Sequence, residues 1–111
     1  MPIPDPIAKP TFSTDEKVDA SAVITLPAVE KSVNVVNSID WSFSGSPTSA
    51  ELTVAIDGVV KWRVDVTSAG PGSKEWGRAG IFGGINQSVI VTLTAGGPGT
   101  TGNINVESRL I

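Results

Sequence analysis

Apolar and polar residues alternate along most of the chain beyond residue 18, which is the pattern of half-buried β-strands. The segment Asp19–Leu26 has its apolar side chains on one face and is ended by Pro27. The next segment, Ser32–Ser44, has the same alternation over 13 residues. That is long for one strand, so we predict a bend or bulge near Asn37-Ser38.

Two further alternating segments meet at Asp57-Gly58. An Asp-Gly pair between such segments predicts a β-hairpin with a type I′ turn, because both central residues of that turn need a positive φ. The residues predicted to face inward are Ala50, Leu52, Val54 and Ile56 before the turn, and Val60, Trp62, Val64 and Val66 after it.

The remaining pattern is interrupted by glycine and proline. Residues 67–75 are predicted to form a loop because Gly70-Pro71-Gly72 breaks regular structure, and strands are expected within 76–82, 88–94 and 103–110. Six to eight short strands joined by turns predict an all-β fold, either an antiparallel β-sandwich or a jelly-roll-like domain.

The N-terminal segment differs from the rest. It has prolines at positions 2, 4, 6 and 10, which remove backbone donors and favour extended conformations. We therefore expect an extended arm over residues 1–17 and a β-sandwich domain over residues 18–111. Ile3, Ile7 and Phe12 are candidate partner-binding residues of this arm, and an unattached terminus is the alternative.

Charge and composition narrow the classes of partner. The net charge is −3; residues 1–30 have five acids and two lysines, and residues 31–111 have six acids and six bases. Nucleic-acid binding therefore lacks its basic surface. No apolar segment approaches the length of a membrane span, and no secretion signal precedes the domain, so we expect no membrane partner and synthesis in a cytoplasm.

The residue types needed for most catalysis are missing. The chain has no histidine, cysteine or tyrosine, which removes the common nucleophiles, most general bases and the imidazole metal ligands. The acids of the predicted strands, Glu51, Asp65 and Glu107, alternate outward onto solvated faces instead of into a cleft. We therefore predict that the protein is not an enzyme and has neither a cofactor nor a metal site.

The three tryptophans differ in their expected roles. Trp41 and Trp62 lie on the apolar sides of their strands, so they are predicted core residues. Trp76 follows a charged loop and comes shortly before Arg78, and both are candidate partner-binding residues. An exposed Trp76 would suit a sugar or a protein partner; a Trp76 lying over the edge of the core is the alternative.

From Val33 to Leu110 the chain resembles small β-sandwich virion proteins of tailed bacteriophages, of the capsid decoration or cement type. The resemblance lies in the segments VNVVNSIDWSFSG, ELTVAIDGVVKWRVDV, SVIVTLTAG and TGNINVE, with a Gly-rich crossover between the second and the third. It implies a structural protein without catalytic residues.

The resemblance also implies a place for the protein. It predicts binding to the major capsid protein on the outer surface of a virion, as a homo-oligomer and preferably a homotrimer, with the arm contacting neighbouring subunits. The alternatives are a carbohydrate-binding or tail-fibre module, which would use Trp76 and the loops 67–75 and 95–102, and a head–tail connector or other minor virion subunit.

Overall fold

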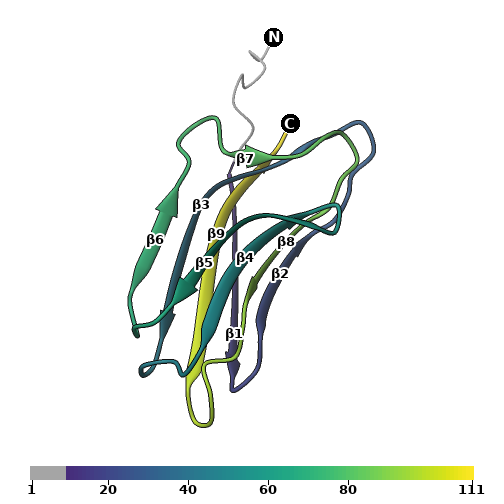
Figure 1. The fold of residues 1–111 in the computed structure, drawn as a ribbon. Helices are drawn as coiled ribbons and strands as arrows, with labels where there is room; N and C mark the ends of the chain where they lie inside the picture. The colour runs from purple at the N-terminus through teal and green to yellow at the C-terminus, as the bar shows by residue number, and fades with distance from the viewer. Residues whose placement is uncertain (1–9) are drawn as a thin grey trace.

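The computed structural model describes residues 10–111 of the chain, and these form strands and turns without a helix (Figure 1). None of the described residues therefore belongs to a helix long and apolar enough to cross a membrane. The strands are β1 (Thr11–Val18), β2 (Ala22–Leu26), β3 (Asn34–Phe43), β4 (Ala50–Ile56), β5 (Val59–Val66), β6 (Gly72–Glu75), β7 (Ile81–Phe82), β8 (Val89–Leu93) and β9 (Thr101–Leu110).

The strands form two antiparallel sheets packed face to face. Sheet A has the order β1-β9-β3-β6, with β7 also paired to β3, and sheet B has the order β2-β8-β4-β5. Most connections cross between the sheets, which gives the double Greek key of a jelly roll. The predicted fold class is confirmed, and the two-residue β7 brings the number of strands in residues 10–111 to nine.

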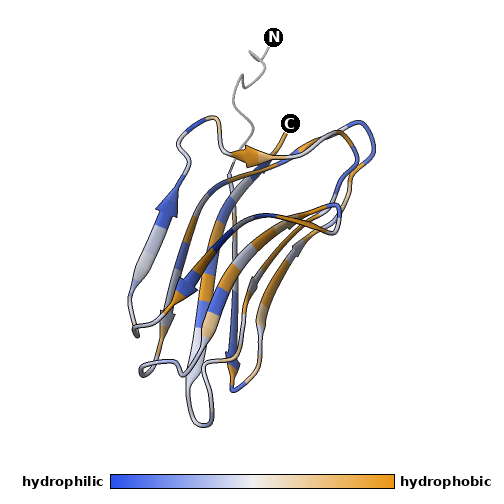
Figure 2. Cartoon of the chain, viewed as in Figure 1, coloured by the Kyte–Doolittle hydropathy of each residue, from blue (hydrophilic) through white to orange (hydrophobic). Residues whose placement is uncertain are grey.

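The core lies between the sheets and follows the alternation of the sequence. In β4 and β8 every second residue is buried. Figure 2 shows the resulting apolar bands along the central strands. Facing them from sheet A are the buried side chains of Ile39, Ile104 and Val106. Burial of these side chains from both sheets holds the sandwich together.

Irregularities in two strands decide which side chains face outward. The bulge predicted near Asn37-Ser38 is confirmed, because the pairing of β3 with β9 shifts between Val36 and Ser38. A second bulge was not predicted. Val54 pairs with Trp62 and Ala55 with Val60, so Lys61 is the extra residue. The prediction that Val60 faces inward is therefore wrong, and Val60 is exposed.

The hairpin between β4 and β5 turns as predicted. Asp57 and Gly58 both have positive φ, 51° and 82°, which is the requirement of a type I′ turn. Ile56 pairs with Val59 directly across this two-residue turn. The amide of Asp57 also donates to the carbonyl of Ser88, which fixes the turn to the end of β8.

The predicted arm is corrected over its second half. Residues 11–17 belong to β1, which pairs with β9 from Thr11 opposite Ser108 to Val18 opposite Thr101, so the expected boundary at residue 17 falls inside a strand. The prolines behind the prediction all precede Thr11. None of them prevents residues 11–18 from pairing as an edge strand. Ile3 and Ile7 lie outside the described residues.

The glycine-rich region after β5 also differs from the prediction. Residues 72–75, expected in a loop, form β6 and pair with residues 38–41 of β3. Of the strand expected within residues 76–82, only Ile81–Phe82 pairs with β3. Residues 76–80 form a turn between β6 and β7. β6 was not predicted because this edge strand of four residues, one of them glycine, has no apolar alternation.

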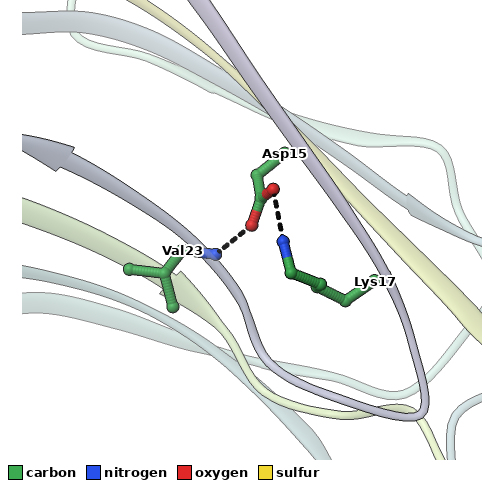
Figure 3. Close-up of polar contacts among 3 residues, drawn as sticks. All are labelled: Asp15, Lys17 and Val23. Carbon is green, nitrogen blue, oxygen red and sulfur yellow. Dashed lines mark hydrogen bonds and ion pairs between the residues drawn. The ribbon is translucent and has the colours of Figure 1, made fainter.

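The two long sides of the sandwich are closed by different means. On the side of β1 and β2, a carboxylate oxygen of Asp15 accepts a hydrogen bond of 2.8 Å from the amide of Val23 (Figure 3). The other oxygen lies 2.6 Å from the ammonium of Lys17. The hydrogen bond from Lys17, followed by that from Val23, holds the pKa of Asp15 below its ordinary value of 3.8.

The side of β5 and β6 is closed by aromatic rings. Trp41 of β3, Trp62 of β5 and Trp76 after β6 form a cluster, with ring centroids 6.5 Å apart for the first pair and 5.1 Å for the second. All three rings are partly buried and pack against the core. The prediction that Trp41 and Trp62 are core residues agrees with this packing.

Candidate functional site

The outward side of sheet A carries a regular array of polar side chains, which we call the polar face. Its rows follow from the strand register. One row across β1, β9, β3 and β6 consists of Phe12, Glu107, Ser38 and Glu75. The next row consists of Thr14, Asn105, Asp40 and Ser73. Apart from Phe12, every side chain in both rows has a hydroxyl, carboxamide or carboxylate group.

The first depression in this face lies over β1, β9 and β3, and we call it the Phe12 groove. It has a volume of about 400 Å³, and its lining includes Phe12, Thr14, Ser38, Asp40, Asn105 and Glu107. Phe12 is 75% exposed although it belongs to β1, a strand paired with β9. An exposed aromatic ring thus borders a row of hydrogen-bonding groups.

The second depression, which we call the arginine pocket, adjoins the first. It has a volume of about 370 Å³, and its lining includes Asn37, Glu75, Arg78 and Arg109. Ser38 and Glu107 line both depressions, so the two form one continuous surface along the polar face. The hydroxyl of Ser38 lies 3.2 Å from the carboxylate of Glu107 and donates a hydrogen bond to it.

The turn between β6 and β7 positions Arg78 over the pocket. The amide of Trp76 donates to the carbonyl of Asn37 at 2.9 Å, and the Asn37 carboxamide donates to the carbonyl of Gly77, also at 2.9 Å. Gly77 adopts a positive φ of 70°, which glycine accepts without strain. The bulge in β3, which frees the Asn37 side chain, therefore anchors the loop that carries Arg78.

Arg109 joins this loop from β9. A terminal nitrogen of its guanidinium group donates to the carbonyl oxygen of Arg78. Its Nε is buried and has no hydrogen-bond partner in the part of the chain that the structure describes. A buried donor left without an acceptor costs about 1–3 kcal/mol. Within residues 10–111, neither Arg78 nor Arg109 forms an ion pair.

One of the three carboxylates predicted to stand on solvated faces occupies a different setting from the one expected. Glu51, Asp65 and Glu107 do face outward from their strands, but Glu107 lines both depressions instead of standing on an open surface. Because β3 pairs with β9 on one side and with β6 on the other, Glu107 lies in one row with Ser38 and Glu75. Among residues 10–111, no three acidic side chains come close enough together to hold a metal ion.

Trp76 lies apart from the polar face. Its ring stands edge-on against Trp62 at an interplanar angle of 80°, and the ammonium of Lys74 lies 5.8 Å from its centre. Of the two arrangements considered for Trp76, the structure has the one in which the ring lies over the edge of the core. Its face is thereby partly covered.

The partner-binding candidates from the sequence separate into groups. Phe12 and Arg78 come to the same face and line adjacent depressions, whereas Trp76 lines neither. Sequence reasoning did not single out Ser38, Asp40, Asn105, Glu107 or Arg109 for binding. The alternation does place these side chains outward on two strands, but nothing local indicates that the strands are neighbours.

Fold and face together define a class, an antiparallel β-jelly-roll domain with a grooved polar sheet face. No protein-family model matches the sequence, and no curated protein matches it. Among solved structures, the chain is similar to the crystal structure of the CBM36-1 domain of a multidomain xylanase from the hindgut metagenome of Trinervitermes trinervoides. The TM-score is 0.48 with 11% sequence identity, and the match covers 86% of this chain and 73% of that chain.

Proposed function

We propose that this domain binds carbohydrate on the polar face of sheet A. The observation that carries the proposal is the Phe12 groove. There an aromatic ring that is 75% exposed shares one depression with the carboxylates of Asp40 and Glu107 and the carboxamide of Asn105. An exposed phenylalanine costs free energy in water, so its position beside polar groups calls for a ligand that is itself part apolar.

A sugar ring has this dual character. Its hydroxyl groups each donate and accept hydrogen bonds, and the C–H bonds of one ring face form an apolar surface. Carboxylates accept hydrogen bonds and a carboxamide does both, so Asp40, Glu107 and Asn105 match the hydroxyls. The ring of Phe12 matches the apolar face.

The site is built on rigid elements. Phe12, Asn105 and Asp40 stand on three adjacent hydrogen-bonded strands, and their relative positions are set by the register of the sheet. Sites on strands hold their geometry more closely than sites on loops. The groove therefore exists before a ligand arrives, which limits the entropy lost on binding.

A glycan array tests the proposal first, with the best ligand then titrated by calorimetry. The variants Asp40→Ala and Asn105→Ala should each weaken that ligand by about tenfold, since each removes a hydrogen-bonding group worth roughly 1.5 kcal/mol. The control variants Thr53→Ala and Thr92→Ala, on the outward side of sheet B, should bind as the unaltered protein does. Absence of binding across the array, or equal loss in the controls, would overturn the proposal.

A second candidate function is attachment to a protein shell, as the resemblance to phage decoration proteins predicts. One end of the sandwich supports it, where exposed apolar side chains gather around the C-terminus and β7: Phe82, Ile85, Leu110 and Ile111. Apolar patches of this kind mark surfaces that meet a protein partner. Binding to a major capsid protein and assembly as a trimer belong to this candidate.

The copy number per purified particle tests this second function, since hundreds of copies indicate decoration and a handful indicates a tail or connector part. Removal of residues 1–9 tests the arm and keeps every strand of residues 10–111 in the chain, whereas removal of residues 1–17 deletes nearly all of β1. Full occupancy of shells by protein lacking residues 1–9 would exclude a clamping role for that segment.

A further inference from the structure

The arginine pocket has two guanidinium groups, and one of them has a donor without an acceptor. Arg78 and Arg109 both line it without an ion pair among the described residues. The Nε of Arg109 is buried and has no acceptor within residues 10–111. Buried polar groups in native proteins are nearly always satisfied, so an unsatisfied Nε on an arginine that lines a pocket points to a missing acceptor.

The pocket also has two carboxylates, which limit the charge of that acceptor. Glu75 and Glu107 balance the two arginines, so the lining has no net charge. Glu107 already accepts a hydrogen bond from Ser38. A ligand group with one negative charge can pair with the guanidinium groups, and it meets about half the repulsion from the two carboxylates that a doubly charged phosphate would meet.

From this arrangement, and resting on the proposed glycan-binding function, we infer that the arginine pocket binds the acidic terminal sugar of a glycan whose neutral sugars lie in the Phe12 groove. The acidic group carries a single charge, as a uronic carboxylate or a sulfate monoester does. The other sugars of the glycan are neutral, because Asp40 and Glu107 line the Phe12 groove and would repel further anionic sugars.

The guanidinium geometry suits such a group. A guanidinium group offers paired donors in one plane, which fit the two oxygens of a carboxylate. The hydrogen bond from Arg109 to the carbonyl of Arg78 holds that plane beside the loop. Because Nε is covered, an anion meets Arg78 and the terminal nitrogens of Arg109 first. Because Nε has no hydrogen bond to lose, a small shift of the Arg109 side chain that brings Nε to an acceptor costs little free energy.

Three oligosaccharides that differ only in the terminal sugar test the inference: one ends in glucose, one in glucuronate and one in glucose 6-sulfate. Calorimetric titration of the full chain should show the glucuronate or the sulfate compound binding about tenfold more tightly than the glucose compound. The two anionic compounds distinguish the carboxylate from the sulfate source. Added salt should weaken the anionic compound and leave the neutral one unchanged.

Substitutions of the two arginines test whether they cause the preference for the acidic compound. Arg78→Gln and Arg109→Gln should each reduce the preference for the acidic compound to within about twofold of the glucose compound. Arg109→Lys keeps the charge without the planar fork, so it should retain only part of the preference. The control Arg63→Gln, on β5 of the other sheet, removes the same charge from an arginine paired with Glu51 and should change nothing. Thermal melts of the Arg109 variants confirm that they fold.

The two proposals fail in distinguishable ways. Equal binding of the glucose and acidic compounds, or a preference that survives both Arg→Gln changes, overturns the acidic-sugar inference while glycan binding stands. Absence of binding to these compounds and across a full glycan array overturns both.

Discussion

The carboxylate of Asp15 and the backbone amide of Val23 are joined by a 2.8 Å hydrogen bond that ties the edge strand of one sheet to the edge strand of the other (Figure 3). Among residues 10–111, no aromatic cluster closes the side of the sandwich where β1 and β2 lie. This polar contact closes that side instead, together with the ion pair in which the ammonium of Lys17 lies 2.6 Å from the carboxylate of Asp15. It adds to the pairing with β9 that holds β1, and with it Phe12, in sheet A.

Removal of the Asp15 charge should make the domain less stable at neutral pH and less sensitive to acid. The pKa of Asp15 is lowered in the folded state, so the contact stabilises the fold above the ordinary pKa of 3.8 and is lost as the pH falls through the lowered value. Asp15→Asn should cost about 0.5–1 kcal/mol at pH near 7, given partial solvent screening. Urea unfolding at several pH values measures both effects.

The comparison for this prediction is Glu16→Gln on the same strand, whose side chain is exposed. This variant should follow the unaltered protein at every pH. If the stability difference between Asp15→Asn and the unaltered protein fails to shrink as the pH falls from about 5 to about 2, the contact does not contribute through its charge.

Phe12 should matter for binding and not for stability. Its side chain is 75% exposed on β1, so Phe12→Ala removes little buried surface and should change the free energy of unfolding by less than about 0.5 kcal/mol. Loss of the ring face should weaken a bound glycan by roughly tenfold, because aromatic stacking is worth up to about 1.5 kcal/mol. Val18→Ala, an exposed change elsewhere on β1, is the matched control, and equal affinities for both variants would remove Phe12 from the site.

Trp76 should show the opposite behaviour. Trp76→Ala removes a ring that packs edge-on against Trp62 at 5.1 Å, and should destabilise the domain by about 2–3 kcal/mol, less than for a fully buried tryptophan. The affinity for a neutral glycan should stay the same. Trp76→Phe keeps part of the packing and should lose less. Loss of glycan binding at unchanged stability would restore Trp76 as the sugar platform that the sequence suggested.

The sequence predicts correctly those features that depend on local pattern. Alternation fixes which way a side chain points, so the inward Trp41 and Trp62 and the outward Asp40 and Glu107 followed from local pattern alone. The Asp57-Gly58 turn followed as well, because its chemistry is local. The exposure of Val60 could not be predicted in this way, because the bulge at Lys61 reverses the alternation and has no signature in the sequence.

The candidate site could not be predicted from local sequence pattern, because it depends on which strands are neighbours in the sheet. Phe12, Asn105 and Asp40 belong to β1, β9 and β3, which are adjacent only because the jelly roll places the last strand between two early ones. The register that puts Phe12 opposite Glu107 depends on pairing across about 95 residues of sequence. Arg78 was singled out from its loop, but its partner Arg109 required the fold.

Gly72 should be the least replaceable glycine of the tryptophan side. It pairs with Trp41, and a Cβ added to Gly72 would lie 2.5 Å from Cε2 of that indole ring. Gly72→Ala must displace this ring, which lies against Trp62 and through it Trp76, so overpacking should cost about 1–3 kcal/mol. At this chain length the melting temperature should fall by about 4–8 °C for each kcal/mol.

Gly45→Ala provides the control, because a Cβ at that glycine meets nothing within 4 Å. The near-ultraviolet circular dichroism of the tryptophans should change in Gly72→Ala and remain unaltered in Gly45→Ala. If Gly72→Ala melts at the same temperature as Gly45→Ala and only its spectrum changes, the indole of Trp41 is free to move aside. The closure of that side of the sandwich would then depend on Trp62 and Trp76 alone, and Trp76→Ala should destabilise the domain by correspondingly more.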